Sequence, residues 1–256
     1  MYGQDFLSNY LGDFSNDYIL IGGNACVLNF DKLKVEFRAT ADLDLVLIVD
    51  NENSKFYSHL CDYLVGNGYV GGLYKCKENN ACAYRFTLKG EQKVERPKII
   101  ELFSKKPDYF DEEKSKELHI TPIETEDGIS NLSAILLDDE IYNFVIQHKC
   151  KIDNVSTVNL QCLLGLKSVA WHNNEDLFAN GKVTKEITVY KHPADMVRIA
   201  MVLPEDEYAY PKGIFESIQL SKNKLGTSEV IAKIPTVAEY VEQTIDFINE
   251  FVKEEN

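Results

Sequence analysis

A stretch of ten residues, 40–49 (TADLDLVLIV), places two acids inside an apolar run and limits the folds open to this chain. Asp42 and Asp44 are two residues apart, and successive side chains of a strand alternate between its faces. Both carboxylates therefore share one face, while Leu43 and Leu45 point into the core. Burial of a carboxylate at the start of such a strand costs free energy unless the carboxylate has a partner. A divalent cation is a natural partner for two carboxylates. The simpler interpretation is a strand end that reaches solvent.

Gly22 and Gly23 lie upstream, between a short apolar strand over residues 17–21 and an apolar helix expected over residues 23–30. Such a turn lets backbone N–H groups approach a phosphate at the helix N-terminus. A phosphate cradle followed by paired acids is the arrangement used in metal-assisted phosphoryl or nucleotidyl transfer.

The bulk composition is that of a globular protein. A chain of 256 residues with 45% hydrophobic residues can bury the core of one large domain or two modest ones. No stretch has the length of a membrane span, and the first residues lack the pattern of a signal peptide, so no membrane partner is expected. The six cysteines have no metal-type spacing, and Cys26 and Cys162 lie in apolar segments as small hydrophobes. We expect a cytoplasmic, reduced and zinc-free protein.

The formal net charge of -14 bears on the choice of partners. A protein this acidic has no general attraction for nucleic acid, because neutralisation of phosphates dominates that binding. A local basic pocket can still take a nucleotide or an RNA end, and the acidity suits a protein that docks a basic partner.

Strand and helix patterns alternate in the first half of the chain. We expect a helix over residues 53–67, opened by Ser54 and ended by Gly66 and Gly68. Strands over residues 84–89 and 98–103 form a hairpin around a polar turn at 90–93, and Gly71-Gly72 is expected to form another turn. The apolar runs 132–137 and 141–146 fit either strand or helix, and the acids at 138–140 fit a turn or a helix start.

Helical spacing dominates the second half. Helices are expected over residues 158–171, from His192-Pro193 to Pro204, and over residues 237–252. The sequence therefore predicts an α+β protein. A mixed β-sheet with flanking helices would occupy residues 1–154, and a mainly helical part would occupy residues 155–256.

Glu101 is a third candidate acid, within the apolar strand over residues 98–103. One interpretation is an exposed residue of a half-buried strand. The other is that this strand pairs beside the strand of Asp42, so that Glu101 adds a third carboxylate next to Asp42 and Asp44. Three oxygen donors are what a magnesium site needs beside substrate phosphates.

Four motifs in order resemble the DNA polymerase β-like nucleotidyltransferase superfamily, and within it the AbiEii/AbiGii toxin branch of abortive-infection systems. They are the G-G turn with R-x-T-x-D-[IL]-D at residues 38–44, I-E-L-F-S at 100–104, L-K-x-x-A-W at 166–171 and K-H-x-x-D-x-x-R at 191–198. The resemblance runs from about residue 19 to residue 202. It implies a nucleotidyltransferase fold for the sheet domain.

The resemblance also implies roles for individual residues. Asp42, Asp44 and Glu101 would bind Mg²⁺, with Glu101 also the base for the attacking hydroxyl. The nucleotide would be bound by residues spread over both halves: Gly22, Gly23, Arg38, Thr40, Lys167, Lys191 and Asp195. A triphosphate needs cations besides magnesium, and lysine is a suitable point charge for phosphate. Where the toxin branch has lysine or serine, this chain has Ala41, so that phosphate contact is absent.

Several of these residues also have structural interpretations. Lys167 can be a lysine on a helix surface, although its neighbours are apolar, and Asp195 can balance a helix dipole. Arg38 can bind phosphate or pin its loop through an ion pair. The histidines at positions 59, 119, 148 and 172 are scattered and indicate no metal cluster.

The pattern as a whole favours a Mg²⁺-dependent enzyme that moves a nucleoside monophosphate from an NTP to an acceptor hydroxyl. The resemblance implies a tRNA or protein acceptor, a role as the toxin of a bacterial toxin–antitoxin or phage-defence system, and a cognate antitoxin. The alternatives are an antibiotic-modifying nucleotidyltransferase, whose polycationic acceptor the acidic surface would attract, and a catalytically silent module that binds nucleotide.

Overall fold

The computed structural model describes residues 6–48, 54–75, 81–89, 96–105, 120–125, 128–181 and 185–255. The chain divides into two compact units, residues 1–158 and residues 159–256. The expected boundary at Asn154 is four residues too early, because Asn154 lies in the turn between two paired strands, β8 (Lys149–Ile152) and β9 (Val155–Val158). Asp153 and Asn154 both have positive φ angles, of 48° and 63°, which suits this tight turn.

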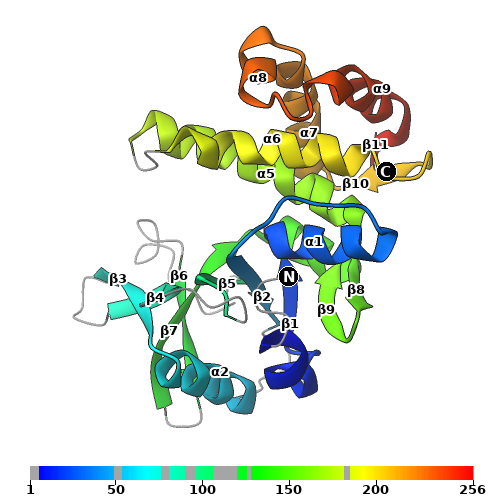
Figure 1. Ribbon diagram of the computed structural model, residues 1–256. Coiled ribbons are helices and arrows are strands. Elements are labelled where there is room, and N and C mark those ends of the chain that lie inside the picture. The colour runs from blue at the N-terminus through cyan, green and yellow to red at the C-terminus, as the bar shows by residue number, and fades with distance from the viewer. Residues whose placement is uncertain are drawn as a thin grey trace. The chain divides into compact units, whose positions relative to one another are not determined.

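The first unit is built on a mixed β-sheet (Figure 1). Nine strands of the described segments take part, in the order β3-β4-β7-β5-β2-β1-β9-β8, with β6 paired to β7 and β4 also paired directly to β5. The central strands are β1 (Tyr18–Ile21), β2 (Asp42–Leu47) and β5 (Ile99–Lys105). β2 runs antiparallel to β1 and parallel to β5. The outer strands are β3 (Tyr69–Lys75), β4 (Ala81–Leu88), β6 (Ile120–Thr125) and β7 (Gly128–Leu137).

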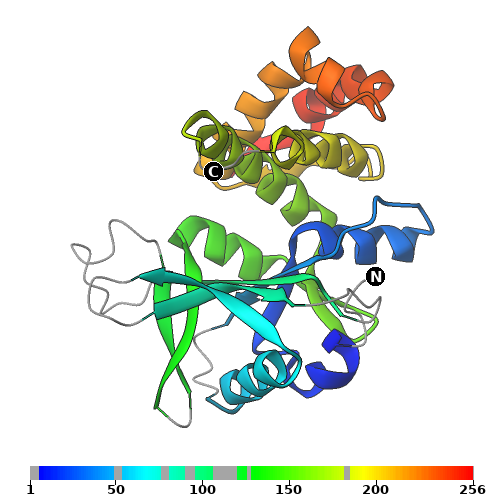
Figure 2. The ribbon, with the colours of Figure 1, turned by 60° about the vertical axis from the view of Figure 1, so that its left-hand side comes forward.

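Helices cover both faces of this sheet. α1 (Gly22–Leu33) lies on one face and α2 (Ser54–Gly66) on the other, as the two views agree (Figures 1 and 2). α4 (Asp139–Gln147) follows β7, and short helical turns η1 (Phe6–Tyr10) and η2 (Gly12–Phe14) precede β1. The expected α+β class with a mixed sheet and flanking helices is confirmed for this unit.

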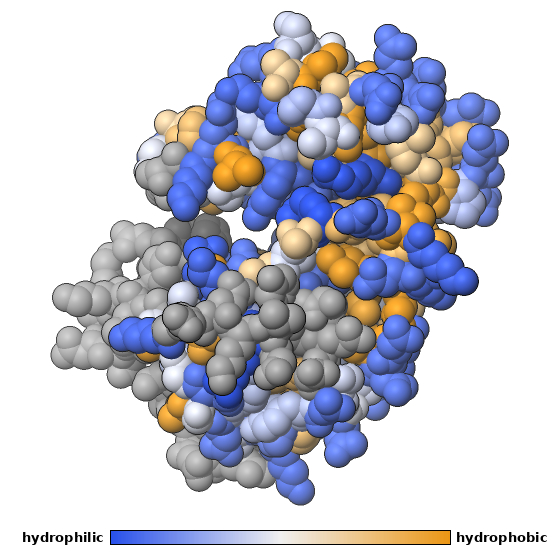
Figure 3. All heavy atoms as spheres, in the orientation of Figure 1, coloured by the Kyte–Doolittle hydropathy of each residue, from blue (hydrophilic) through white to orange (hydrophobic). Residues whose placement is uncertain are grey.

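The second unit is mainly helical, as expected. It contains α5 (Leu160–Ala179), α6 (Glu186–Ala200), α7 (Lys212–Leu225), α8 (Ser228–Lys233), η4 (Ala238–Tyr240) and α9 (Val241–Phe251). Two short parallel strands, β10 (Tyr208–Tyr210) and β11 (Val252–Glu254), pair with each other. The fully buried Trp171, Met196 and Ile218 belong to α5, α6 and α7, whereas Ile187 on α6 is 76% exposed. Hydrophilic side chains cover much of the visible surface of this unit in Figure 3.

Most expected elements of the first half are present. The strand over residues 17–21, the helix after the Gly-Gly turn, the α2 helix and the pairing of β4 with β5 are confirmed. The two ambiguous runs become strand β7 and helix α4, and Asp138 caps α4 by accepting a hydrogen bond from the backbone N–H of Ile141 at 2.7 Å. The turn at 90–93 and His119 lie outside the described residues.

Two expectations about local structure are wrong. The helix expected to open at His192-Pro193 begins at Glu186 and contains Pro193 in its interior. An interior proline removes one backbone hydrogen bond, but the buried Val189, Met196 and Val197 anchor the helix on both sides of it. Gly71-Gly72 is not a turn, because both glycines lie in β3, where the pairing with β4 shifts register between Gly71 and Leu73.

Cys26 and Cys162 are buried thiols, as their apolar surroundings predict. Over the described parts of the chain, no helix combines the length and apolar character that crossing a bilayer requires.

Candidate functional site

Strand β2 carries both aspartates on one face. Asp42 and Asp44 are partly exposed, whereas Leu43 and Leu45 are fully buried. This alternation is the one expected from the sequence, with the carboxylates on one face of the sheet and the leucines in the core on the other.

Glu101 lies beside Asp44 on the neighbouring strand. In the parallel pairing of β2 with β5, Asp44 is in register with Glu101 and Leu43 with Ile100. Residues in register share a face of the sheet, and the burial pattern of β5 agrees, since Glu101 is partly exposed between the buried Ile100 and Leu102. The pairing that the Glu101 hypothesis required is therefore present, and the three acids lie on one face of two adjacent strands.

The Gly-Gly turn packs directly against this acidic face. Gly22 has a φ angle of +72°, and a Cβ atom built on it would lie 1.9 Å from Oδ2 of Asp44. A Cβ atom on Gly23 would lie 2.8 Å from Oγ1 of Thr40. A side chain at either position would force the aspartate or the threonine beside the turn to move. The two glycines thus let Asp44 and Thr40 pack closely against the turn. This packing accounts for the glycines whether or not the turn also binds a phosphate.

The N-terminus of α1 begins at this turn. Its N-cap position is occupied by Ile21, which offers no capping side chain, and no acidic residue lies in the first turn. The carboxylate of Asp44, packed beside Gly22, is close to the positive end of the helix dipole.

Asn24 is a site residue that sequence reasoning missed. It is fully buried, and its Nδ2 donates a hydrogen bond to the backbone carbonyl of Asp42 at 2.6 Å. This bond joins the first turn of α1 to the start of β2. Its Oδ1 has no hydrogen-bond partner among the described residues. The available signal was an amide at the start of an otherwise apolar helix.

Arg85 is a second residue that the sequence did not single out. It lies on β4, in register with Glu101 across an antiparallel pairing. Its Nε donates to Oε1 of Glu101 at 2.6 Å. The arginine side chain is 53% exposed and the glutamate side chain 16% exposed.

The chemistry of these acids fits a magnesium ion, since carboxylate oxygens are its preferred protein ligands. Asp42 and Asp44 fit it, because they lie two residues apart on one face of β2. Nevertheless, no three His, Cys, Asp or Glu side chains of the described segments come close enough to one another to hold a metal ion. Glu101 is on the correct face, but its carboxylate is engaged by Arg85.

Lys167 and Asp195 are brought together within the second unit. Nζ of Lys167, on α5, donates to Oδ2 of Asp195, on α6, at 2.9 Å, and the two side chains are 5% and 0% exposed. Nη1 of Arg198 lies 3.5 Å from the other carboxylate oxygen of Asp195. Lys167 is therefore not a surface lysine, and the anion that compensates its burial is a carboxylate of the same unit.

Two further candidate residues are Lys191 on α6 and Arg38 in the segment before β2. Lys191 precedes the buried His192 on α6 and is partly exposed. Arg38 is partly exposed in the segment before β2, with its guanidinium 5.6 Å from the centre of the Phe37 ring. This contact does not decide between the two roles considered for Arg38.

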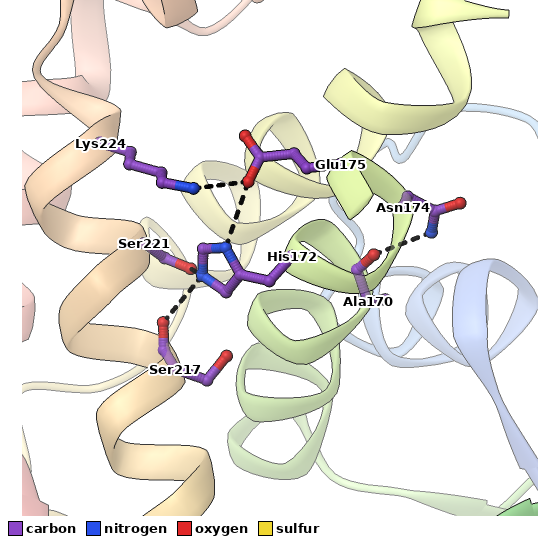
Figure 4. A network of polar contacts seen from close by, with 7 residues as sticks. All are labelled: Ala170, His172, Asn174, Glu175, Ser217, Ser221 and Lys224. Carbon is purple, nitrogen blue, oxygen red and sulfur yellow. Dashed lines mark hydrogen bonds and ion pairs between the residues drawn. The ribbon is translucent and has the colours of Figure 1, made fainter. Parts of the chain in front are cut away.

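A further polar network joins α5 to α7 (Figure 4). His172 contacts Oε2 of Glu175 through Nδ1 at 3.3 Å and Oγ of Ser221 through Nε2 at 2.9 Å. Lys224 donates to the same oxygen of Glu175 at 2.6 Å. The order serine, histidine, acid is that of a nucleophilic triad, but Ser221 is fully buried between helices, so substrate cannot reach it. We interpret this network as a connection between helices.

Comparison with known proteins gives no relative for this chain: no family model, no curated protein and no solved structure matches it.

Proposed function

We propose that this protein is a magnesium-dependent nucleotidyltransferase, which moves a nucleoside monophosphate from an NTP to an acceptor hydroxyl. The observation that carries the proposal is the packing of the Asp42–Asp44 face against Gly22 and the first turn of α1, with Glu101 in register on the adjacent strand. A phosphate-binding backbone and metal-binding carboxylates would then meet at one place.

The reaction follows from these groups. The acceptor oxygen attacks the α-phosphorus of the NTP, the bond from that phosphorus to the oxygen bridging the α- and β-phosphates breaks, and pyrophosphate leaves. The hydroxyl proton passes to a carboxylate, for which Glu101 is the candidate base. A bound magnesium ion would neutralise the charge that develops on the phosphates. Asp42 and Asp44 would hold that ion, and the N–H groups of the first turn of α1 would bind phosphate oxygens.

The proposal includes a nucleotidyltransferase fold for the first unit and a cytoplasmic location. It also includes a role as a toxin that modifies a tRNA or a protein and is paired with a cognate antitoxin. Binding of the nucleotide by Lys167, Lys191 and Asp195 is also a prediction. The burial of Lys167 against Asp195 supports a structural contribution for that pair at the same time.

Incubation with Mg²⁺ and each labelled NTP, in the presence of tRNA and of a protein pool, tests the proposal. We expect pyrophosphate release together with label on one acceptor class, and loss of both in Asp42→Ala and Asp44→Ala with unchanged thermal unfolding. Asp62→Asn, which neutralises an exposed acid of α2, is the control and should be fully active. Full activity of Asp42→Ala and Asp44→Ala would contradict the metal assignment.

A second candidate, a silent nucleotide-binding module, is favoured by one observation: Glu101 is engaged by Arg85, and the acids of the described segments do not form a three-ligand group. Calorimetric binding of an NTP without pyrophosphate release would select it. Label on an aminoglycoside instead of a macromolecule would indicate the antibiotic-modifying alternative, whose polycationic acceptor suits the net charge of -14.

A further inference from the structure

Arg85 and Glu101 form an ion pair at the place where the proposed metal site needs a third ligand. The register of β4, β5 and β2 puts Arg85, Glu101 and Asp44 in one row across three adjacent strands. Glu101 is thus located between a guanidinium on one side and a carboxylate on the other. With Nε of Arg85 at 2.6 Å from Oε1, Glu101 does not form a three-acid group with Asp42 and Asp44.

We propose that Arg85 is a positioning residue that holds Glu101 in an ion pair and gives it up when a divalent cation binds beside Asp42 and Asp44. This inference rests on the proposed function. The guanidinium and the cation compete for one carboxylate, because each is a positive charge that needs oxygen atoms of Glu101 as partners. Occupation of the site by the cation is therefore coupled to release of Glu101 by Arg85.

The exposure of the pair makes this exchange feasible. The Arg85 side chain is 53% exposed, so water can solvate the guanidinium once it leaves the carboxylate. An ion pair of this kind is weak enough to be displaced by a dication. The buried Lys167–Asp195 pair, with side chains 5% and 0% exposed, has no such route to solvent.

Direct titration with Mn²⁺, followed by electron paramagnetic resonance and without any substrate, tests the role of Arg85. Mn²⁺ accepts the same oxygen ligands as Mg²⁺. Arg85→Met keeps much of the aliphatic side chain and removes the competitor, so we expect Mn²⁺ to bind about two- to fivefold more tightly than to the wild type. Arg85→Gln should act in the same direction.

Two controls separate this mechanism from a general change of charge. Lys89→Met removes a positive charge from an exposed residue just after β4 and should alter Mn²⁺ affinity less than Arg85→Met. In a Glu101→Gln background, Arg85→Met should change Mn²⁺ affinity no more than Lys89→Met does, because the residue over which arginine and cation compete has lost its charge.

The outcomes distinguish this inference from the proposed function. Unchanged or weaker Mn²⁺ binding by Arg85→Met and Arg85→Gln overturns the role of Arg85, as does equal tightening in the Glu101→Gln background. If the wild type binds Mn²⁺ and Asp44→Asn does not, the metal site stands in either case. If the wild type binds no Mn²⁺, the proposed function fails and the inference fails with it.

Discussion

Two ion pairs of similar length have opposite surroundings in this protein. Arg85 and Glu101 are 2.6 Å apart on the sheet of the first unit, with side chains 53% and 16% exposed. Lys167 and Asp195 are 2.9 Å apart between two helices of the second unit, with side chains 5% and 0% exposed. The two contact distances are similar, but the two pairs differ in their exposure to solvent. An exposed charge that loses its partner is hydrated, whereas a buried charge is not.

Solvent exposure indicates which ion pair can exchange its partner and which is rigid. The first pair can open when another cation arrives, which suits a site that binds metal and nucleotide. The second pair fastens α5 to α6, with Arg198 adding a second cation near Asp195 at 3.5 Å. Each of the following predictions tests whether this contrast between an exchangeable pair and a structural pair is correct.

The variant with the greatest predicted effect changes Glu101, the candidate base of the proposed transfer reaction. Glu101→Gln should lower turnover by about 10²–10⁴-fold and leave nucleotide binding largely intact, because a carboxamide neither accepts the proton nor binds magnesium as well. Turnover and NTP affinity, measured separately, check this. Asp195→Asn is the matched change in the buried pair and should lower thermal stability. Unchanged turnover in Glu101→Gln would return Glu101 to a structural role.

Replacement of each cation by methionine should separate the pairs by stability. Lys167→Met removes the ammonium that donates to the buried carboxylate of Asp195 at 2.9 Å, so we expect a loss of about 3 kcal/mol in the free energy of unfolding. Arg85→Met should cost less than about 1 kcal/mol. From the sequence alone, Lys167→Met is expected to keep or raise stability; the carboxylate partner reverses that expectation. Urea unfolding of both variants measures this, and equal losses would mean that the two ion pairs contribute equally to stability.

The sequence was sufficient where structure depends on local pattern. Alternation of apolar residues predicted β2 and β5, and the Gly-Gly turn predicted the start of α1, because these signals lie within a few residues. The partners of the charged residues could not be predicted in this way. Arg85 is 16 residues from Glu101, Lys167 is 28 residues from Asp195, and only the strand register and helix packing select those pairs.

Failures of local interpretation have similar causes. Pro193 predicted a helix start, but packing of the buried residues around it continues α6 through the proline. Gly22 was expected to accommodate a phosphate, and the sequence held no sign that Asp44 would lie against it. That contact arises because Ile21 is paired with Asp44 across β1 and β2, so the residue that follows Ile21 approaches the carboxylate.

A substitution at Gly22 disturbs the acidic face of β2 without removing a charge. Gly22→Ala should destabilise the protein by more than about 2 kcal/mol, since a positive φ angle strains alanine by about 1–2 kcal/mol and the new Cβ would also displace Asp44. Gly68→Ala is the matched control, with a φ angle of +75° and no atom within 4 Å of the added Cβ. Similar stability losses in the two variants would mean that Asp44 moves aside easily and that the site is not tightly packed.

The smallest expected effect concerns a titrating side chain of the first unit, His148, which follows α4 and contacts Phe144 with ring centres 4.4 Å apart. Partial burial lowers the pKa of His148 below its ordinary value of 6.5. The unfolded chain therefore takes up a proton at His148 before the folded protein does as pH falls through that value, so the contribution of His148 to the free energy of unfolding decreases. Burial thus disfavours the charged form of His148. The buried Lys167 differs, because the carboxylate of Asp195 stabilises its charged ammonium. Urea unfolding at about pH 7.5 and about pH 5.5 should show a smaller loss of stability in His148→Gln than in the wild type. An equal loss in both proteins would assign the acid sensitivity to other groups and remove His148 from the contrast.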